Sequence, residues 1–346
     1  MISIVRIFLL SGIVLFVNSC KKHDVATAQN IYVAGSQWNG TNYVASFWKN
    51  GVVTHLSDGT RSTVANSIVV NGGDVYVAGE EEYIAFNNIS VAKYWKNGIA
   101  TNLSDGTKQA YAKSIFVNGN DVYVAGYEDN YVYSRAKYWK NGVDVTLTDG
   151  TRNAHAYSIV VVGNDVYVAG WENTVGNYQG VAKYWKNGVA VNLTDGIKDS
   201  RAFSIVVIGS EVYVAGYESI SPYSRRIAKY WKNGIATNLT DGTTDAVANS
   251  IAVNGNEIFV TGYEIDQMFS PGVAKYWRNG MVNNLSDGSK IARANAIAVF
   301  GNDVFVAGQE SNGSTFMAKY WKNGGAIIPD NTGFSTSNAS SVFVTQ

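Results

Sequence analysis

The sequence has little of several residue types, and each shortage excludes something. One cysteine in 346 residues means that no disulfide can form within the chain. Lysine plus arginine and aspartate plus glutamate number 27 each, so the formal net charge is zero and no basic field exists to hold a nucleic-acid backbone. The three histidines, His23, His55 and His155, are too far apart for zinc-ligand spacing. We therefore expect no nucleic-acid partner, no metal and no cofactor.

The N-terminal segment contains a sustained apolar run. Residues 7–17 follow a single positive charge and have the length of a signal peptide, which is short for a transmembrane helix. The run ends in Val17-Asn18-Ser19-Cys20, which resembles the lipobox of bacterial lipoproteins apart from Asn18. That resemblance implies removal of residues 1–19, lipidation of Cys20, a polar tether over 20–29 and attachment to the outer membrane. The alternative is an ordinary signal peptide with an incidental cysteine.

Residues 30–346 consist of one repeated pattern. An aromatic-Trp-Lys/Arg-Asn-Gly segment recurs with its tryptophan at positions 48, 95, 139, 185, 231, 277 and 321. Successive tryptophans are 47, 44, 46, 46, 46 and 44 residues apart, a period typical of four-stranded propeller blades. Helical repeats have similar periods, but these segments lack the apolar spacing of a helix.

Four strands, named a to d in chain order, can be identified in each unit. The Asn-Gly between strands c and d is a two-residue hairpin turn, because both residues tolerate a positive φ. In strand c, Tyr138 and Trp139 are adjacent and must project from opposite faces. Large rings on both faces require that both faces be covered, as they are in a blade between two neighbours.

The two ends of the repeated region are complementary. The first unit begins with strand b at residues 31–35, and residues 341–344 match a strand a that lacks its strand b. Joining them would complete the last blade and remove two open sheet edges. The sequence therefore predicts an all-β fold: a seven-bladed β-propeller with four antiparallel strands per blade, closed by the C-terminal strand joining the N-terminal blade.

Residue types that recur at one position of the unit are assigned to the scaffold. Six units have a Glu two residues after the strand-b glycine and a Lys before the Tyr-Trp pair, whereas the first unit has Gln37 and Ser46. Their joint loss predicts that each Glu pairs with the Lys across the b–c hairpin, where an exposed pair would contribute only ~0–1 kcal/mol. A ring of carboxylates that binds cations is the alternative. The Asp-Gly that ends strand d is interpreted as a turn and not as a calcium loop.

Positions that vary between units are free for function. The b–c and d–a connections share one face, and they vary in length and content. An alanine recurs just before strand a, and the residues on both sides of it vary. If strand a is innermost, these residues surround the mouth of a central channel and could stack on and hydrogen-bond a ligand. The candidate ligand-binding residues are Tyr111, Lys113, His155, Tyr157, Arg201, Phe203, Arg293 and Asn295; the alternative is that they are solvated loop ends.

Known catalytic arrangements are missing from the sequence. It has no Gly-x-Ser-x-Gly nucleophile elbow. Glycoside hydrolysis needs two carboxylates, and the acidic residues outside the repeated pattern are scattered over different units. They include Glu82, Asp129, Asp144, Asp199, Asp245 and Asp266. We therefore predict no catalytic residues and no enzymatic activity.

The unit itself resembles a known bacterial repeat. Ala-Lys-Tyr-Trp-Lys-Asn-Gly, then Leu-Ser/Thr-Asp-Gly, then Ser-Ile-Val-Val-x-Gly-Asn-Asp-Val-Tyr-Val-Ala-Gly is similar to HAF-type extracellular repeats, and the architecture is that of kelch-like propellers without their double glycine. The resemblance implies the fold and no catalytic residues. We predict a monomeric module on the cell envelope, attached to the membrane by its lipid alone, that binds a glycan, peptide or partner protein through the b–c/d–a face. A hydrolytic enzyme with a site at the channel mouth is the alternative, and a purely structural envelope protein is a third possibility.

Overall fold

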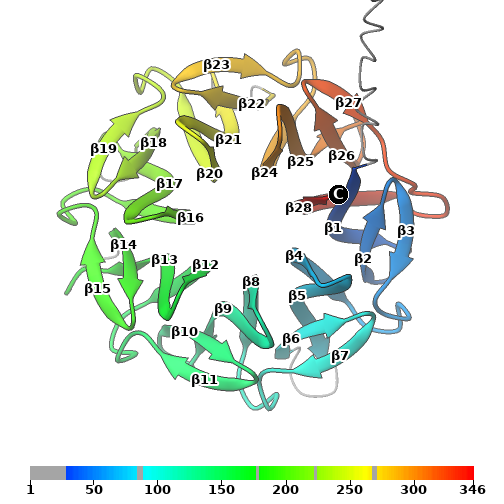
Figure 1. Cartoon of the computed structure of the whole chain (residues 1–346), viewed down its shortest axis with the longest axis horizontal. Helices are drawn as coiled ribbons and strands as arrows, with labels where there is room; N and C mark the ends of the chain where they lie inside the picture. Colours follow the sequence, from blue (N-terminus) through cyan, green and yellow to red (C-terminus); the bar gives the residue numbers. More distant parts are fainter. Residues whose placement is uncertain (1–28, 84–88, 177–178, 222–223, 267–270) are drawn as a thin grey trace, which may run out of the picture.

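The computed structural model describes residues 29–83, 89–176, 179–221, 224–266 and 271–346, which form seven four-stranded antiparallel sheets. Figure 1 shows these sheets arranged as blades around a common axis. Blade 1 has the strand order β28-β1-β2-β3, and blades 2 to 7 follow along the chain as β4–β7 through β24–β27. The predicted fold class is therefore confirmed. No helix in the described part of the chain is long and apolar enough to cross a membrane.

Each blade contains one strand of each type. The innermost strands a are β4 (Thr63–Asn71), β8 (Ala110–Asn118), β12 (Ala154–Val162), β16 (Ser200–Ile208), β20 (Asp245–Asn254), β24 (Ala292–Phe300) and β28 (Thr336–Thr345). The strands b are β1 (Asn30–Trp38), β5 (Asp74–Tyr83), β9 (Asp121–Asp129), β13 (Asp165–Asn173), β17 (Glu211–Ser219), β21 (Glu257–Ile265) and β25 (Asp303–Ser311).

The outer half of each blade contains the two remaining strands. The strands c are β2 (Tyr43–Lys49), β6 (Ile89–Lys96), β10 (Ser134–Lys140), β14 (Gly180–Lys186), β18 (Arg226–Lys232), β22 (Val273–Arg278) and β26 (Phe316–Lys322). The outermost strands d are β3 (Val52–His55), β7 (Ile99–Asn102), β11 (Val143–Thr146), β15 (Val189–Asn192), β19 (Ile235–Asn238), β23 (Met281–Asn284) and β27 (Gly325–Ile327). In each c–d turn the asparagine and the glycine both have positive φ, as expected from the Asn-Gly pairs.

The ring is closed by the pairing of β1 with β28, as predicted. The two strands pair from Asn30↔Thr345 to Trp38↔Thr336. From β28, Ala339 and Val342 are buried in a cluster that joins blade 1 to blade 7. The closing strand therefore contributes both hydrogen bonds and core contacts.

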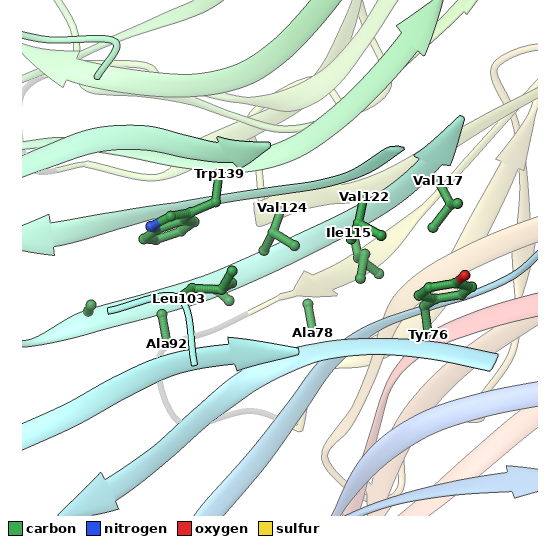
Figure 2. Close-up of a cluster of buried hydrophobic side chains, with 11 residues drawn as sticks. Tyr76, Ala78, Ala92, Leu103, Ile115, Val117, Val122, Val124 and Trp139 are labelled. Atoms are coloured by element: carbon green, nitrogen blue, oxygen red, sulfur yellow. The ribbon is translucent and has the colours of Figure 1, made fainter. Parts of the chain in front are cut away.

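The hydrophobic core lies between the blades. Figure 2 shows the interface of blades 2 and 3, where Tyr76 and Leu103 of blade 2 face Ile115, Val124 and Trp139 of blade 3. All seven repeat tryptophans are at most 2% exposed. Tyr138 packs on the opposite interface, against blade 4, so both faces of strand c are covered as the adjacent rings predicted.

The recurring glutamates and lysines form ion pairs across the b–c hairpins. The pairs are Glu81–Lys93, Glu128–Lys137, Glu172–Lys183, Glu218–Lys229, Glu264–Lys275 and Glu310–Lys319. The pairing is confirmed, and the low contribution of an exposed pair does not apply to these lysines. The six lysine side chains are only 5% to 18% exposed, because neighbouring blades cover strand c on both faces.

The Glu172–Lys183 pair predicts an asymmetric response to mutation. Glu172→Leu leaves the ammonium of Lys183 buried without a partner, and we expect it to lower the free energy of unfolding by about 3 kcal/mol. Lys183→Met is expected to cost less, because Glu172 keeps Arg152 at 3.1 Å. Urea denaturation of both variants and of the double variant checks this. Equal losses for the two single changes would contradict it.

Strand a has a β-bulge at the same position in every blade. In β8 the register shifts between Ala112 and Ser114, so Lys113 has no partner in β9. Strand a therefore begins before the recurring alanine and not after it, as in β8, which starts at Ala110. The variable positions on both sides of the alanine belong to the innermost strand and are not loop ends. The bulge leaves no room for a side chain opposite it: a Cβ on Gly126 would lie 1.8 Å from the Tyr111 carbonyl oxygen.

Candidate functional site

All eight predicted ligand-binding residues lie in innermost strands, on the two sides of the recurring alanine. They are Tyr111 and Lys113 in β8, His155 and Tyr157 in β12, Arg201 and Phe203 in β16, and Arg293 and Asn295 in β24. The first residue of each pair has a partner in strand b, and the second occupies the bulge. Six of the eight are on the consecutive blades 3, 4 and 5. Their role in ligand binding stays a prediction.

Strand b contributes three aromatic residues that are not among these eight, and two of them, Tyr127 and Tyr217, were missed in the sequence analysis. Tyr127 pairs with Tyr111, Trp171 with His155, and Tyr217 with Arg201. Each lies between the repeated glycine and the repeated glutamate of strand b. The signal was present in the sequence, because this position also varies between units.

These side chains form a continuous line of ring contacts across blades 3 to 5. The order is Lys113, Tyr111, Tyr127, His155, Trp171 and Arg201, and successive groups lie 5.0, 4.8, 3.6, 4.7 and 4.5 Å apart. The rings of Tyr127 and His155 are parallel within 2°. The line arises because the residue before the alanine in one blade stacks on the strand-b aromatic residue of the preceding blade.

The bulge positions add a second aromatic group to the site. Tyr157 contacts Phe203 at 5.2 Å, and Phe203 contacts Tyr217 at 5.8 Å. The Tyr157 hydroxyl lies 3.1 Å from Nδ1 of His155, so the two groups are joined. The outcome is a mostly aromatic surface on three neighbouring blades.

Arg293 and Asn295 of blade 7 are not part of these groups. Arg293 lies over the ring of Tyr263, a blade 6 residue, at 5.1 Å. The Asn295 amide donates to the Ala339 carbonyl at 2.9 Å, and Asn66 and Asn249 make the same bond to the next blade. Asparagine at the bulge therefore joins neighbouring blades, which gives Asn295 a structural role.

A pocket of about 790 Å³ opens beside the line of rings. Its walls include Tyr111, Tyr127, Asp129, Asn153, His155, Trp171 and Arg201, together with the b–c loop of blade 3. That loop presents Tyr131, Val132 and Tyr133, which are 80%, 72% and 40% exposed. The pocket is therefore off the axis of the ring, over blades 3 and 4.

Tyr131 has a positive φ at a loop position that is occupied by glycine in blades 1 and 7. The loops Asn39-Gly40, Asn130-Tyr131 and Asn312-Gly313 share one geometry, in which the asparagine side chain accepts from two later backbone amides. The φ values are +100° at Gly40, +105° at Gly313 and +72° at Tyr131. A left-handed φ at tyrosine costs about 1–2 kcal/mol, and such strain concentrates at functional sites.

The charges of the site are largely balanced within the protein. Lys113 pairs with Glu80 of blade 2 at 3.0 Å, and Asn66 donates to the same carboxylate. Burial raises the pKa of Glu80 in spite of the Lys113 ammonium. Burial, and then Glu128, raises the pKa of Asp129. Within the described ranges, the Asp129 carboxylate has no hydrogen-bond or ion-pair partner, so it can accept from a ligand.

His155 is expected to remain neutral under physiological conditions. Burial, followed by Arg201 and Lys113, lowers the pKa of its imidazole from the usual 6.5 to about 3. Because the unfolded chain binds a proton here below about pH 6.5 and the folded chain does not, the stabilising contribution is complete above that pH and is lost as the pH falls toward 3. We expect His155→Phe, which keeps an aromatic ring, to lose less stability than the wild type on acidification.

The measurement is urea denaturation of both proteins at several pH values, together with NMR titration of the imidazole. An imidazole of His155 that titrates near its usual pKa would contradict the prediction.

Two other predictions concern metals and the lipid anchor. Among the described residues, no three His, Cys, Asp or Glu side chains are grouped so that they could hold a metal ion. Cys20 and His23 lie outside the described residues.

The comparisons with known proteins leave the family open. No family model matches the chain, and no curated protein matches it. The fold and the site define the class of the protein as a seven-bladed β-propeller with an eccentric aromatic pocket. The resemblance to HAF-type and kelch-like repeats stays a prediction.

Proposed function

We propose that this protein is a binding module whose ligand occupies the pocket over blades 3 and 4. The observation that carries the proposal is the line of ring contacts from Lys113 to Arg201, which is concentrated on three of seven otherwise similar blades. The scaffold does not require it, since blades 1 and 2 have Ser36 and Glu80 at the strand-b position. Propellers commonly serve as interaction modules.

Binding is favoured over hydrolysis by the chemistry of the walls. Asp129 is the one carboxylate among the described residues that line the pocket, whereas glycoside hydrolysis uses two. The His155 ring is stacked on Tyr127 and its Nδ1 lies beside Tyr157, so it is held as part of the wall. Turnover of a bound ligand that Asp129→Asn abolishes would support the hydrolytic alternative.

The proposal extends to a lipid anchor at Cys20, after removal of residues 1–19, on a monomer of the outer membrane. The Val17–Cys20 pattern supports it. Metabolic labelling with palmitate tests it: Cys20→Ser should lose the label and move to the soluble fraction. A variant that stays in the membrane would contradict the anchor.

An anchored ring would present the pocket away from the membrane. Gln29 donates at 2.9 Å to Asp303, which begins β25 directly after an a–b turn, and Ile31 donates to Asn50 in a c–d turn at 2.8 Å. Because consecutive strands are antiparallel, these turns lie on the face opposite the b–c loops. The tether therefore leaves the ring on the face opposite the one that carries the pocket.

The test is a screen of the full-length protein in detergent on glycan and peptide arrays, followed by titration of the best ligand. Arg201→Ala uncovers Trp171 and should weaken binding at least about tenfold, as truncated binding anchors do. The matched control is Arg278→Ala, since Arg278 lies over Phe259 on the opposite face. Equal affinity for the wild type and Arg201→Ala would refute the placement.

Tyr131→Gly provides a second site variant with an intact backbone. Glycine occupies this position in blades 1 and 7, so we expect the variant to fold normally and to change the free energy of unfolding by less than about 1 kcal/mol. Its ligand affinity should fall, because the most exposed aromatic side chain at the pocket is removed. Unchanged affinity would exclude the blade 3 loop from the site.

A further inference from the structure

A second pocket adjoins the first. It has a volume of about 570 Å³ and is lined by residues of blades 3 and 4, including Asp149, Arg152, Asn173 and Val175. Tyr133 and Asn153 line both pockets. The two pockets therefore adjoin at these two residues, which form the ridge between them. Each volume lies within the range of about 300–1,000 Å³ that is typical of ligand sites.

Several polar side-chain atoms around the two pockets have no hydrogen-bond partner among the described residues. Nε1 of Trp171 and Oδ1 of Asn173 are buried and make no hydrogen bond to any described residue. Nδ2 of Asn153 likewise donates to no group that the structure describes, while Oδ1 of Asn153 accepts from Ser134. With the Asp129 carboxylate, the set contains two donors and two acceptors. Buried polar groups are rarely left unpaired, so the two buried atoms, Nε1 of Trp171 and Oδ1 of Asn173, indicate a ligand.

A ligand with hydroxyl groups can satisfy both the donors and the acceptors, because a hydroxyl both donates and accepts hydrogen bonds. The charges around the second pocket sum to zero, because Arg152 and Lys183 both pair with Glu172 and the Asp149 carboxylate supplies a second negative charge. A strongly charged ligand would therefore find no net counter-charge in the second pocket. The partly exposed ring of Tyr133 offers a flat apolar surface of the kind that can pack on the C–H face of a sugar.

We infer that the ligand is an uncharged oligosaccharide that crosses the ridge of Tyr133 and Asn153, with sugar units in both pockets. The inference rests on the proposed binding function and adds to it the class and the minimum length of the ligand. A monosaccharide fills one pocket, whereas a chain that crosses the ridge also reaches Asn173. Affinity must then grow with chain length until both pockets are filled.

The experiment is calorimetric titration of the full-length protein in detergent with neutral glucose, xylose and mannose oligomers, from monosaccharide to octasaccharide. We expect the dissociation constant to fall at least about tenfold along the series that binds, as for an added binding anchor. Asn173→Leu removes the unpaired oxygen and should lose this gain but keep monosaccharide binding. Asn173→Asp keeps an acceptor and should retain the gain.

A second variant tests the ridge directly. Tyr133→Ala should weaken binding of the long oligomers about tenfold. Tyr43→Ala is the matched control, because Tyr43 has the same 40% exposure on blade 1. Both changes are at the surface, so folding is not at risk.

The outcomes separate the inference from the proposed function. Affinity that does not depend on chain length overturns the two-pocket inference and leaves a binding module. Binding of array peptides but of no saccharide overturns the ligand class and also leaves a binding module. A protein that binds neither saccharide nor peptide overturns both proposals.

Discussion

Gly126→Ala should lower the free energy of unfolding by about 3 kcal/mol or more, although it adds a single methyl group. The new Cβ would lie 1.8 Å from the Tyr111 carbonyl oxygen and 3.0 Å from Cζ3 of Trp139. The oxygen belongs to backbone that the β-bulge holds in place, and the ring is buried between blades 2 and 3. Neither the oxygen nor the ring can move away without separating strands, so the clash destabilises the whole blade.

The control for this change is Gly119→Ala. Gly119 has a left-handed φ of +60°, but nothing lies within 4 Å of its added Cβ. The expected cost is therefore only the conformational penalty of about 1–2 kcal/mol. Guanidinium denaturation compares the two variants. If Gly126→Ala unfolds at the wild-type midpoint, or costs no more than Gly119→Ala, the close approach at the bulge does not constrain the blade.

Removal of residues 336–346, which deletes β28, is expected to have the second large effect. The deletion exposes the hydrogen-bonding edge of β1 and takes Ala339 and Val342 out of the cluster around Trp48 and Phe305. We expect the melting temperature to fall by more than about 10 °C, since a loss of several kcal/mol lowers the melting temperature by a few degrees for each kcal/mol. The open edge should also cause association between molecules.

Thermal unfolding and size-exclusion chromatography measure this effect. Removal of Gln346 alone is the control, because this residue follows the end of β28. A synthetic peptide of residues 336–346 should restore the melting temperature when it is added to the shortened protein. A shortened protein that keeps the association state and the melting temperature of the wild type would show that the closing strand is dispensable.

Most of the fold could be predicted because the sequence repeats. The Asn-Gly turns, the paired rings Tyr138 and Trp139, and the complementary ends each follow from local rules and are confirmed. The start of strand a could not be predicted, because the bulge at Lys113 interrupts the alternation by which a strand is identified. Burial of the lysines depends on how closely neighbouring blades pack, which one unit does not reveal.

The site was predicted only in part, because cross-strand pairing adds strand-b residues to it. The alanine-flanking positions of blades 3 to 5 do lie together, but Tyr127 and Tyr217 were missed. The sequence analysis considered only the positions beside the recurring alanine, whereas cross-strand pairing places these two strand-b residues next to them. The strain at Tyr131 became visible only when its loop was compared with those of Gly40 and Gly313.

The closing strand also determines when the protein can finish folding. Asn30 and Gln346 are joined by a hydrogen bond although 316 residues separate them. Blades 2 to 7 are built from neighbouring hairpins and can form in turn as the ribosome releases the chain. Blade 1 has to wait for the last residues, and contacts so distant in sequence form slowly. Until β28 is complete, one hydrogen-bonding edge of β1 therefore has no partner strand.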